Sequence, residues 1–144
     1  MKDIDAAIAT LQEKYISAAS SRNTSALIQL YDPEVRIFDA WGVWEYHGTD
    51  SWKIALESWL SSSPEGKYSV AFSDCDVVGS PEMATMTAIV KYALVAPDGK
   101  ESHSMHNRIT WVLRKSGNEL FIIHEHTSAP IGFDDMKAIL KRPD

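Results

Sequence analysis

Apolar residues recur at helical spacing in the first part of the chain. Between residues 3 and 20 they fall every three or four positions, which predicts an amphipathic helix. These residues are Ile4, Ala7, Ile8, Leu11, Tyr15, Ala18 and Ala19. The segment SSRNTSA interrupts the pattern, and we expect Thr24 and Ser25 to cap a second, short helix. Asp32-Pro33 should end that helix, because the residue before a proline is disfavoured in helical conformation.

The pattern then changes twice within thirty residues. Val35 and Ile37 alternate with Arg36 and Phe38, which indicates a strand, and VWEYH after a bend at Gly42 is a plausible return strand. A third helix should begin with Thr49 or Asp50 as its N-cap and end at SSSPEG. Its apolar face consists of Trp52, Ala55, Leu56, Trp59 and Leu60.

From residue 67 onward the chain predicts four long strands, at 67–79, 83–96, 102–115 and 119–128. The turns GSPE, APDGKE and KSGNE are short, so an antiparallel meander is the economical topology. The last segment, FDDMKAILKR, is expected to form one short helix. We therefore predict a single α+β domain over residues 1–144, with a cone-shaped, curved antiparallel or mixed sheet packed against the N-terminal helices.

Composition narrows the function classes. The net charge of −6 argues against nucleic acid and anionic membrane surfaces as partners. No apolar run approaches the roughly 18 residues of a membrane span, and the charged N-terminus lacks a signal-peptide core, so we expect a cytoplasmic protein. The single cysteine, Cys75, excludes an internal disulfide and is expected to be buried in a strand. No phosphate-binding or dinucleotide glycine motif is present, and we expect no cofactor.

Three phrases connect the chain to a known family. They are YDPEVRIFDAWG after the first two helices, YHGTDSWKIAL entering the third, and RITWVLRKSGNELFIIHEHTSAP at the end. Together they resemble the SnoaL-like branch of the nuclear transport factor 2-like (cystatin-like, ketosteroid isomerase-related) superfamily, over nearly the whole chain. The resemblance implies the cone-shaped fold, and we expect a homodimer formed through the outer sheet face. Because this superfamily includes isomerases, dehydratases, hydrolases, cyclases and non-catalytic assembly domains, the fold alone does not assign a function.

The motif His124-Glu125-His126 has three readings: a metal site, an acid–base centre or the polar end of a structural strand. A cupin-type metal site needs a glutamate a few residues later and a distant third histidine, but Ala129 and Pro130 follow, so we predict no metal site. His126 suits proton transfer at neutral pH. On a regular strand the two histidines share one face and Glu125 lies on the other, and a bulge would exchange them. The sequence leaves open which face points inward.

Asp39 and Arg108 are further candidates for catalysis. The family resemblance places Asp39 where ketosteroid isomerase-like enzymes carry their aspartate base, and neighbouring aromatic residues would raise its pKa. Tyr15 could serve as the hydroxyl donor of such a site, although no second acid is evident on the third long strand. Asp39 could equally be a turn residue before Gly42. Arg108 lies mid-strand among apolar residues and should pair with a ligand, or internally with Asp39 or Glu125.

Aromatic residues supply walls for a pocket. We expect a small organic molecule to be bound by Trp41, Trp44, His47, Trp59, Tyr92 and Glu125. If the protein is an enzyme, the resemblance favours a cofactor-free isomerase or lyase such as a dehydratase, with Asp39, His126 and Arg108 as catalytic residues. The alternative is a non-catalytic ligand-binding or oligomerisation module like the association domain of calcium/calmodulin-dependent kinase.

Overall fold

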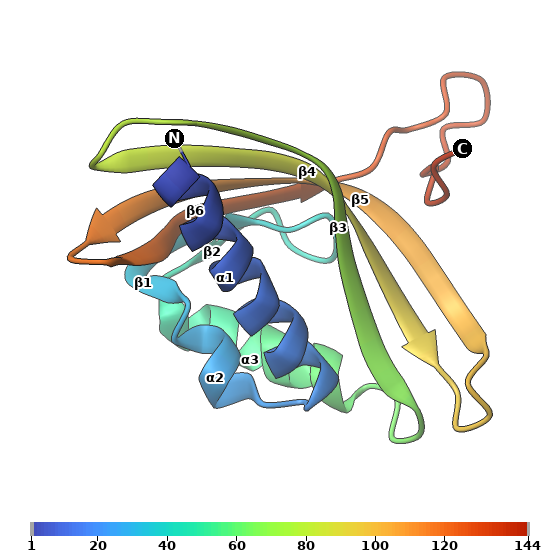
Figure 1. Cartoon of the computed structure of the whole chain (residues 1–144). Helices are drawn as coiled ribbons and strands as arrows, with labels where there is room; N and C mark the ends of the chain where they lie inside the picture. Colours follow the sequence, from blue (N-terminus) through green and yellow to red (C-terminus); the bar gives the residue numbers. More distant parts are fainter. Residues whose placement is uncertain (1, 144) are drawn as a thin grey trace.

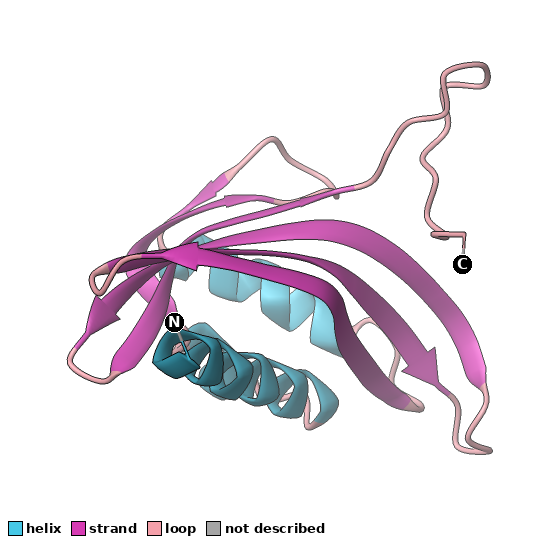
Figure 2. Cartoon of the chain, turned by 45° about the horizontal axis from the view of Figure 1, so that its top comes forward, coloured by secondary structure: helices cyan, strands magenta, loops and turns pink. Residues whose placement is uncertain are grey.

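The computed structural model of the chain describes residues 2–143 and has three helices on one side of a six-stranded sheet (Figure 1). The helices are α1 (Lys2–Ser20), α2 (Thr24–Ile28) and α3 (Thr49–Ser61). The strands are β1 (Tyr31–Phe38), β2 (Tyr46–His47), β3 (Lys67–Gly79), β4 (Met83–Val95), β5 (Glu101–Ser116) and β6 (Glu119–Ser128). The sheet is strongly curved and the helices lie against its concave face (Figure 2). The expected α+β class is confirmed.

The sheet is open and mixed, with the strand order β2-β1-β6-β5-β4-β3. Strands β3 to β6 form the predicted antiparallel meander. Strand β1 then pairs in parallel with β6, and the two-residue strand β2 pairs antiparallel with β1 at the edge. This arrangement brings the end of β1 beside the end of β6, because both strands run in the same direction.

Helices α1 and α3 bury the apolar stripes that the sequence predicts. The buried side chains of these helices are Ile8, Leu11, Tyr15, Ala18, Ala19, Trp52, Leu56 and Leu60. They pack against inward side chains of the sheet, including the fully buried Met86, Trp111 and Leu113. No helix within residues 2–143 is long and apolar enough to cross a membrane.

The helix N-caps differ from the predicted ones. The Asn23 side chain, rather than Thr24 or Ser25, caps α2 by accepting a hydrogen bond from the N–H of Ala26 at 3.0 Å. Helix α3 follows Gly48, whose φ of 84° places it in the left-handed region, and it has no side-chain cap. In both helices the N-cap residue is the one just before the first helical residue. That residue lies outside the helix and can adopt the non-helical backbone conformation of a cap.

Two further expectations about secondary structure are wrong. Asp32-Pro33 lies inside β1 and not at a helix end, and Tyr31 is the first residue of that strand. Residues 133–142 form no helix; the first part of this segment lies in a turn closed by the bridge between Ile131 and Ala138. The chain then returns along β5, where the C=O of Leu140 accepts a hydrogen bond from the N–H of His106 at 2.7 Å. A backbone group engaged in this way is no longer available to a helix.

Candidate functional site

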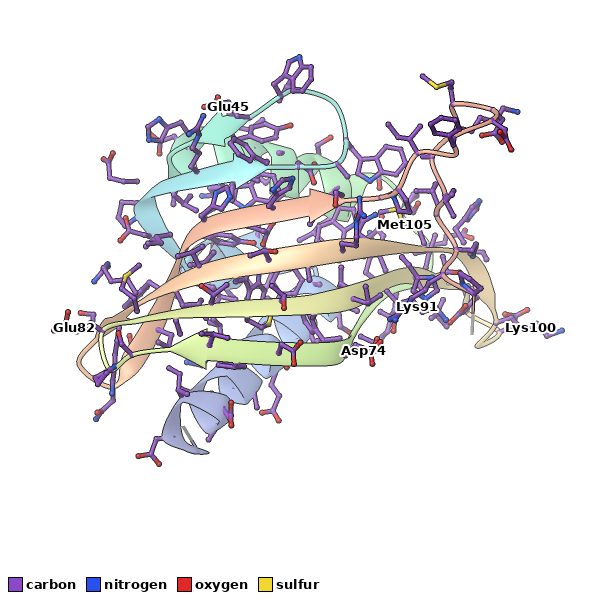
Figure 3. The ribbon with its side chains drawn as sticks, turned by 90° about the horizontal axis from the view of Figure 1, so that it is seen from above. Glu45, Asp74, Glu82, Lys91, Lys100 and Met105 are labelled. Atoms are coloured by element: carbon purple, nitrogen blue, oxygen red, sulfur yellow. The ribbon has the colours of Figure 1, made fainter. Side chains whose placement is uncertain are left out.

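A cavity of about 590 Å³ lies between α1, α3, the loop of residues 39–46 and strands β4 to β6. Six aromatic side chains line it: Tyr15, Trp41, Tyr46, Trp52, Trp59 and Tyr92. The polar groups include Asp39, Asn107 and Glu125. Met105, another lining residue, lies on β5 near the start of the C-terminal segment (Figure 3). An apolar pocket with a few polar groups at its end is the usual form of a small-molecule site.

A β-bulge in β6 decides which residues face this cavity. Ile122 pairs with Leu113, and the next paired residue is His124, so Ile123 is an extra residue in the strand. A regular strand would turn His124 inward two residues after the buried Ile122. The bulge shifts the alternation, and Glu125 becomes the buried residue instead. The question that the sequence leaves open is therefore settled in favour of the glutamate.

Glu125 is 2% exposed and is held by two hydrogen-bond donors. Its Oε1 accepts from the Tyr31 hydroxyl at 2.7 Å and from Trp111 Nε1 at 2.9 Å. Burial raises the pKa of Glu125 from 4.5 to about 7; the two donors oppose this rise and the charge of Asp39 adds to it. Because both donors point at Oε1, the proton of the neutral acid belongs on Oε2. Neutral Glu125 is thus a hydrogen-bond donor through that oxygen.

Asp39 directly follows β1 and reaches the same cavity. Its Oδ1 accepts a hydrogen bond from Thr127 Oγ1 at 3.0 Å, and that hydroxyl oxygen accepts from the N–H of Ala40 at 2.9 Å. Burial raises the pKa of Asp39, while the bond from Thr127 and nearby backbone N–H groups oppose the rise. The parallel pairing of β1 with β6 brings Asp39 near Glu125, and the charge of Asp39 contributes to the raised pKa of that glutamate.

Two tyrosine hydroxyls complete the polar end. Tyr15 on α1 and Tyr92 on β4 place their hydroxyl oxygens 3.4 Å apart. Burial raises the pKa of both phenols, and the charge of Glu125 raises both further. Both tyrosines therefore keep their protons at neutral pH and can donate hydrogen bonds. Tyr15 is fixed by the rings of Phe72 and Trp111, whose centroids lie 5.9 and 5.7 Å from its own.

Arg108 and His126, which we expected to act at the cavity, lie on the outer face of the sheet. Arg108 is exposed, and its Nε donates to Ser128 Oγ at 3.0 Å; the expected pairing with Asp39 or Glu125 does not form. His126 is exposed and packs edge-on against Phe38, with ring centroids 5.3 Å apart. The bulge explains the position of His126, since it places this imidazole on the face opposite to Glu125.

The other predicted binding residues divide into two groups. Those that line the cavity are Asp39, Trp41, Trp59, Tyr92 and Glu125. Trp44 is 95% exposed on the loop before β2, and His47 at the end of β2 is also exposed; neither lines the cavity. The structure therefore does not place these two expected binding residues in the wall of the cavity.

Sequence reasoning did not single out Asn107 or recognise the part played by Tyr31 and Trp111. Asn107 is 3% exposed and lines the cavity. Its position two residues before Ile109 on an alternating strand was the available signal. The sequence contains no comparable signal for Tyr31 and Trp111, because their hydrogen bonds to Glu125 depend on strand pairing and on the bulge.

Within residues 2–143, no three His, Cys, Asp or Glu side chains are grouped so as to hold a metal ion. His124 Nδ1 lies 2.7 Å from the C=O of Arg36, so one ring nitrogen is engaged with the neighbouring strand. Cys75 is exposed beside Asp74, whose φ is 52°, and not buried as expected. The pairing of β3 with β4 is irregular at this point, and the Cys75 Sγ accepts a hydrogen bond from Gln12 Nε2 of α1 at 3.3 Å.

The SnoaL-like domain family model matches residues 8–132. The chain belongs to this family. The SnoaL-like domain resembles an NTF2-like protein of unknown function from Pseudomonas putida, with a TM-score of 0.87 and 22% identity over 100% of this chain and 99% of the other. It also resembles a protein of unknown function with a cystatin-like fold from Nostoc punctiforme (TM-score 0.72, 12% identity, covering 90% and 93%).

A nuclear transport factor 2-like superfamily protein from Salmonella enterica is a third similar structure, with a TM-score of 0.69 and 17% identity over 89% of the SnoaL-like domain and 93% of the other chain. Comparison with curated proteins finds no significant match. These similarities support the NTF2-like, cystatin-like fold and leave the chemistry to be argued from the site.

Proposed function

We propose that this SnoaL-like domain binds a small, partly apolar organic molecule and catalyses a cofactor-free proton transfer on it, as an isomerase or a lyase. The observation that carries this proposal is that two carboxyl groups and two adjacent tyrosine hydroxyls line the same cavity. Such a cavity excludes water from part of the ligand and strengthens polar interactions at the reacting end.

The two acids have different environments, which suits them to different roles. Glu125 is the more deeply buried and has a pKa of about 7, so it retains its proton longer and acts as the acid through Oε2. Asp39 is half-buried and stabilised as an anion by Thr127, so it acts as the base. Asp39 takes a proton from carbon while Glu125 or Tyr15 donates a hydrogen bond to the oxygen where negative charge develops. Returning the proton to a different atom completes an isomerisation.

The alternative, a non-catalytic assembly module, is not favoured. An assembly module needs no polar groups in an internal cavity. The cavity of about 590 Å³ in this protein is lined by two acids whose pKa values are raised. Raised pKa values of this kind are typical of functional sites.

Hydrogen–deuterium exchange tests the proposal without knowledge of the natural substrate. Small cyclic ketones with exchangeable α-protons are incubated with the protein in D₂O and followed by NMR. We expect enzyme-dependent exchange that falls by about 10²–10⁴-fold in Asp39→Asn. Glu119→Gln, which changes an exposed acid at the start of β6 outside the cavity, is the matched control and should exchange at the wild-type rate. Exchange that is absent, or unchanged in Asp39→Asn, contradicts the proposal.

A further inference from the structure

The charges around the cavity are all of one sign. Asp39 and Glu125 line it, whereas no Lys, Arg or His among residues 2–143 does. The pKa values of Asp39 and Glu125 are consistent with this absence of positive charge. Burial is the largest cause of the raised pKa of each acid, and no cationic side chain lowers either pKa. A carboxylate in apolar surroundings is costly unless a positive charge accompanies it. The protein supplies no such charge within the cavity.

Six aromatic side chains contribute to the remaining wall. Trp59 and Tyr92 meet edge to face with centroids 5.6 Å apart, and Tyr46 and Trp52 meet at 5.2 Å. All four of these aromatic residues line the cavity. An aromatic face attracts a cation and repels an anion, and the attraction grows when water is excluded. The walls therefore have the same preference for positive charge as the two acids.

We infer that the ligand of this cavity is an organic ammonium ion, with its charge near Asp39 and Glu125 and its apolar part against the aromatic wall. This inference rests on the proposed function, because it names the class of molecule that the same cavity takes. With an ammonium ion beside ionised Glu125, Tyr15 is the hydrogen-bond donor for the proposed proton transfer. An anionic ligand is disfavoured, since it would approach two acids without a counter-charge.

The proton of Glu125 gives the inference a measurable consequence. A neighbouring cation favours ionised Glu125, so binding of an ammonium ion near neutral pH releases a proton to the buffer. A neutral ligand that accepts a hydrogen bond from Oε2 favours the protonated acid and takes up a proton instead. The other titratable groups facing Glu125 are Tyr15, Tyr31, Tyr92 and Asp39. The three phenols keep their protons at this pH, so the exchange belongs to the two acids.

The experiment compares three probes with one ring system and different charges: 2-naphthylmethylamine, 2-naphthylmethanol and 2-naphthoate. Binding to the full chain is measured by calorimetry at pH 7 in phosphate and in Tris, whose different ionisation enthalpies report proton exchange. We expect the amine to bind at least about tenfold more tightly than the alcohol, and the naphthoate more weakly than either. Amine binding should release protons, and Glu125→Gln should bind the amine with less release. Glu119→Gln, outside the cavity, should behave as wild type.

Contrary results would show whether the ammonium inference alone fails or whether the proposed function fails with it. If the alcohol binds as tightly as the amine, or the amine causes proton uptake, the ammonium inference is wrong while the binding function stands. Tight binding of the naphthoate would also overturn it. If none of the three probes binds at millimolar concentration, both the inference and the proposed binding function fail.

Discussion

Replacing Glu125 with glutamine should make the protein more stable at alkaline pH and leave its stability almost unchanged at acidic pH. Neutral glutamic acid offers one acceptor oxygen to Tyr31 and Trp111 and one donor to the cavity. Glutamine offers the same pair, with its amide oxygen toward the two donors and its N–H₂ toward the cavity. The substitution therefore mimics the protonated acid and cannot ionise.

The size of this change in the free energy of unfolding follows from the pKa of Glu125. The pKa of Glu125 is raised from 4.5 to about 7 on folding, and one pKa unit corresponds to about 1.4 kcal/mol. Because the folded pKa is the higher one, the stabilisation is fully present below pH 4.5 and is lost as the pH rises to about 7 and beyond. Ionising this buried acid therefore costs the native state about 3 kcal/mol. Glu125→Gln should recover most of that amount above pH 8.

Urea unfolding of wild type and variant at pH 5, 6, 7, 8 and 9 measures the effect. The difference in free energy of unfolding should grow from about 1 kcal/mol at pH 5 to about 3 kcal/mol at pH 7, and should stay near that value up to pH 9. Glu119→Gln is the matched control, because Glu119 begins the same strand and is exposed; its effect should stay within about 0.5 kcal/mol throughout. A difference for Glu125→Gln that does not vary with pH would refute the reasoning, since it would mean that this carboxyl titrates alike in both states.

Four further predictions follow from other contacts. Tyr31→Phe removes one donor from the Glu125 carboxyl, so the pKa of that acid, followed by NMR titration, should rise further. Asp39→Asn removes a neighbouring negative charge, so the same titration should show a lower pKa, and no change would contradict the interaction of the two acids. Arg22→Ala should lower the free energy of unfolding by about 1–3 kcal/mol, because its guanidinium donates to two backbone carbonyls at 2.7 and 2.9 Å; an unchanged urea midpoint would contradict it. Light scattering should find the dimer that we propose to form through the outer sheet face, and a monomer at high concentration would exclude it.

Much of the fold could be predicted from local pattern. The helical spacing in α1 and α3 and the alternation in the long strands are properties of short windows, and each survives in the structure. The parallel pairing of β1 with β6 could not be read in this way, because it joins segments about ninety residues apart. The C-terminal segment shows the same limit. Its composition suits a helix, but contact with β5 engages its backbone, so tertiary structure overrides the local preference.

The candidate site was predicted less well, for a related reason. Asp39, Trp59 and Tyr92 reach the cavity as expected, since the elements that carry them were correctly identified. Arg108 and His126 were misplaced because the orientation of a strand residue depends on register, and composition does not fix register. The second acid that the sequence appeared to lack on the third long strand is supplied instead by the fourth, as Glu125.

The extra residue in β6 also bears on how relatives of this protein should be compared. Ile122 faces the core and Glu125 faces the cavity, an odd spacing that a strand can accommodate only where one residue is left unpaired. A relative without Ile123 would keep its inward carboxylate at the paired position, yet an ungapped alignment from the start of the strand would set that carboxylate against His124. If site residues were then assigned from the aligned positions, a histidine would be equated with the carboxylate of the relative. Alignments across this strand should therefore carry a gap at residue 123, placed from structure.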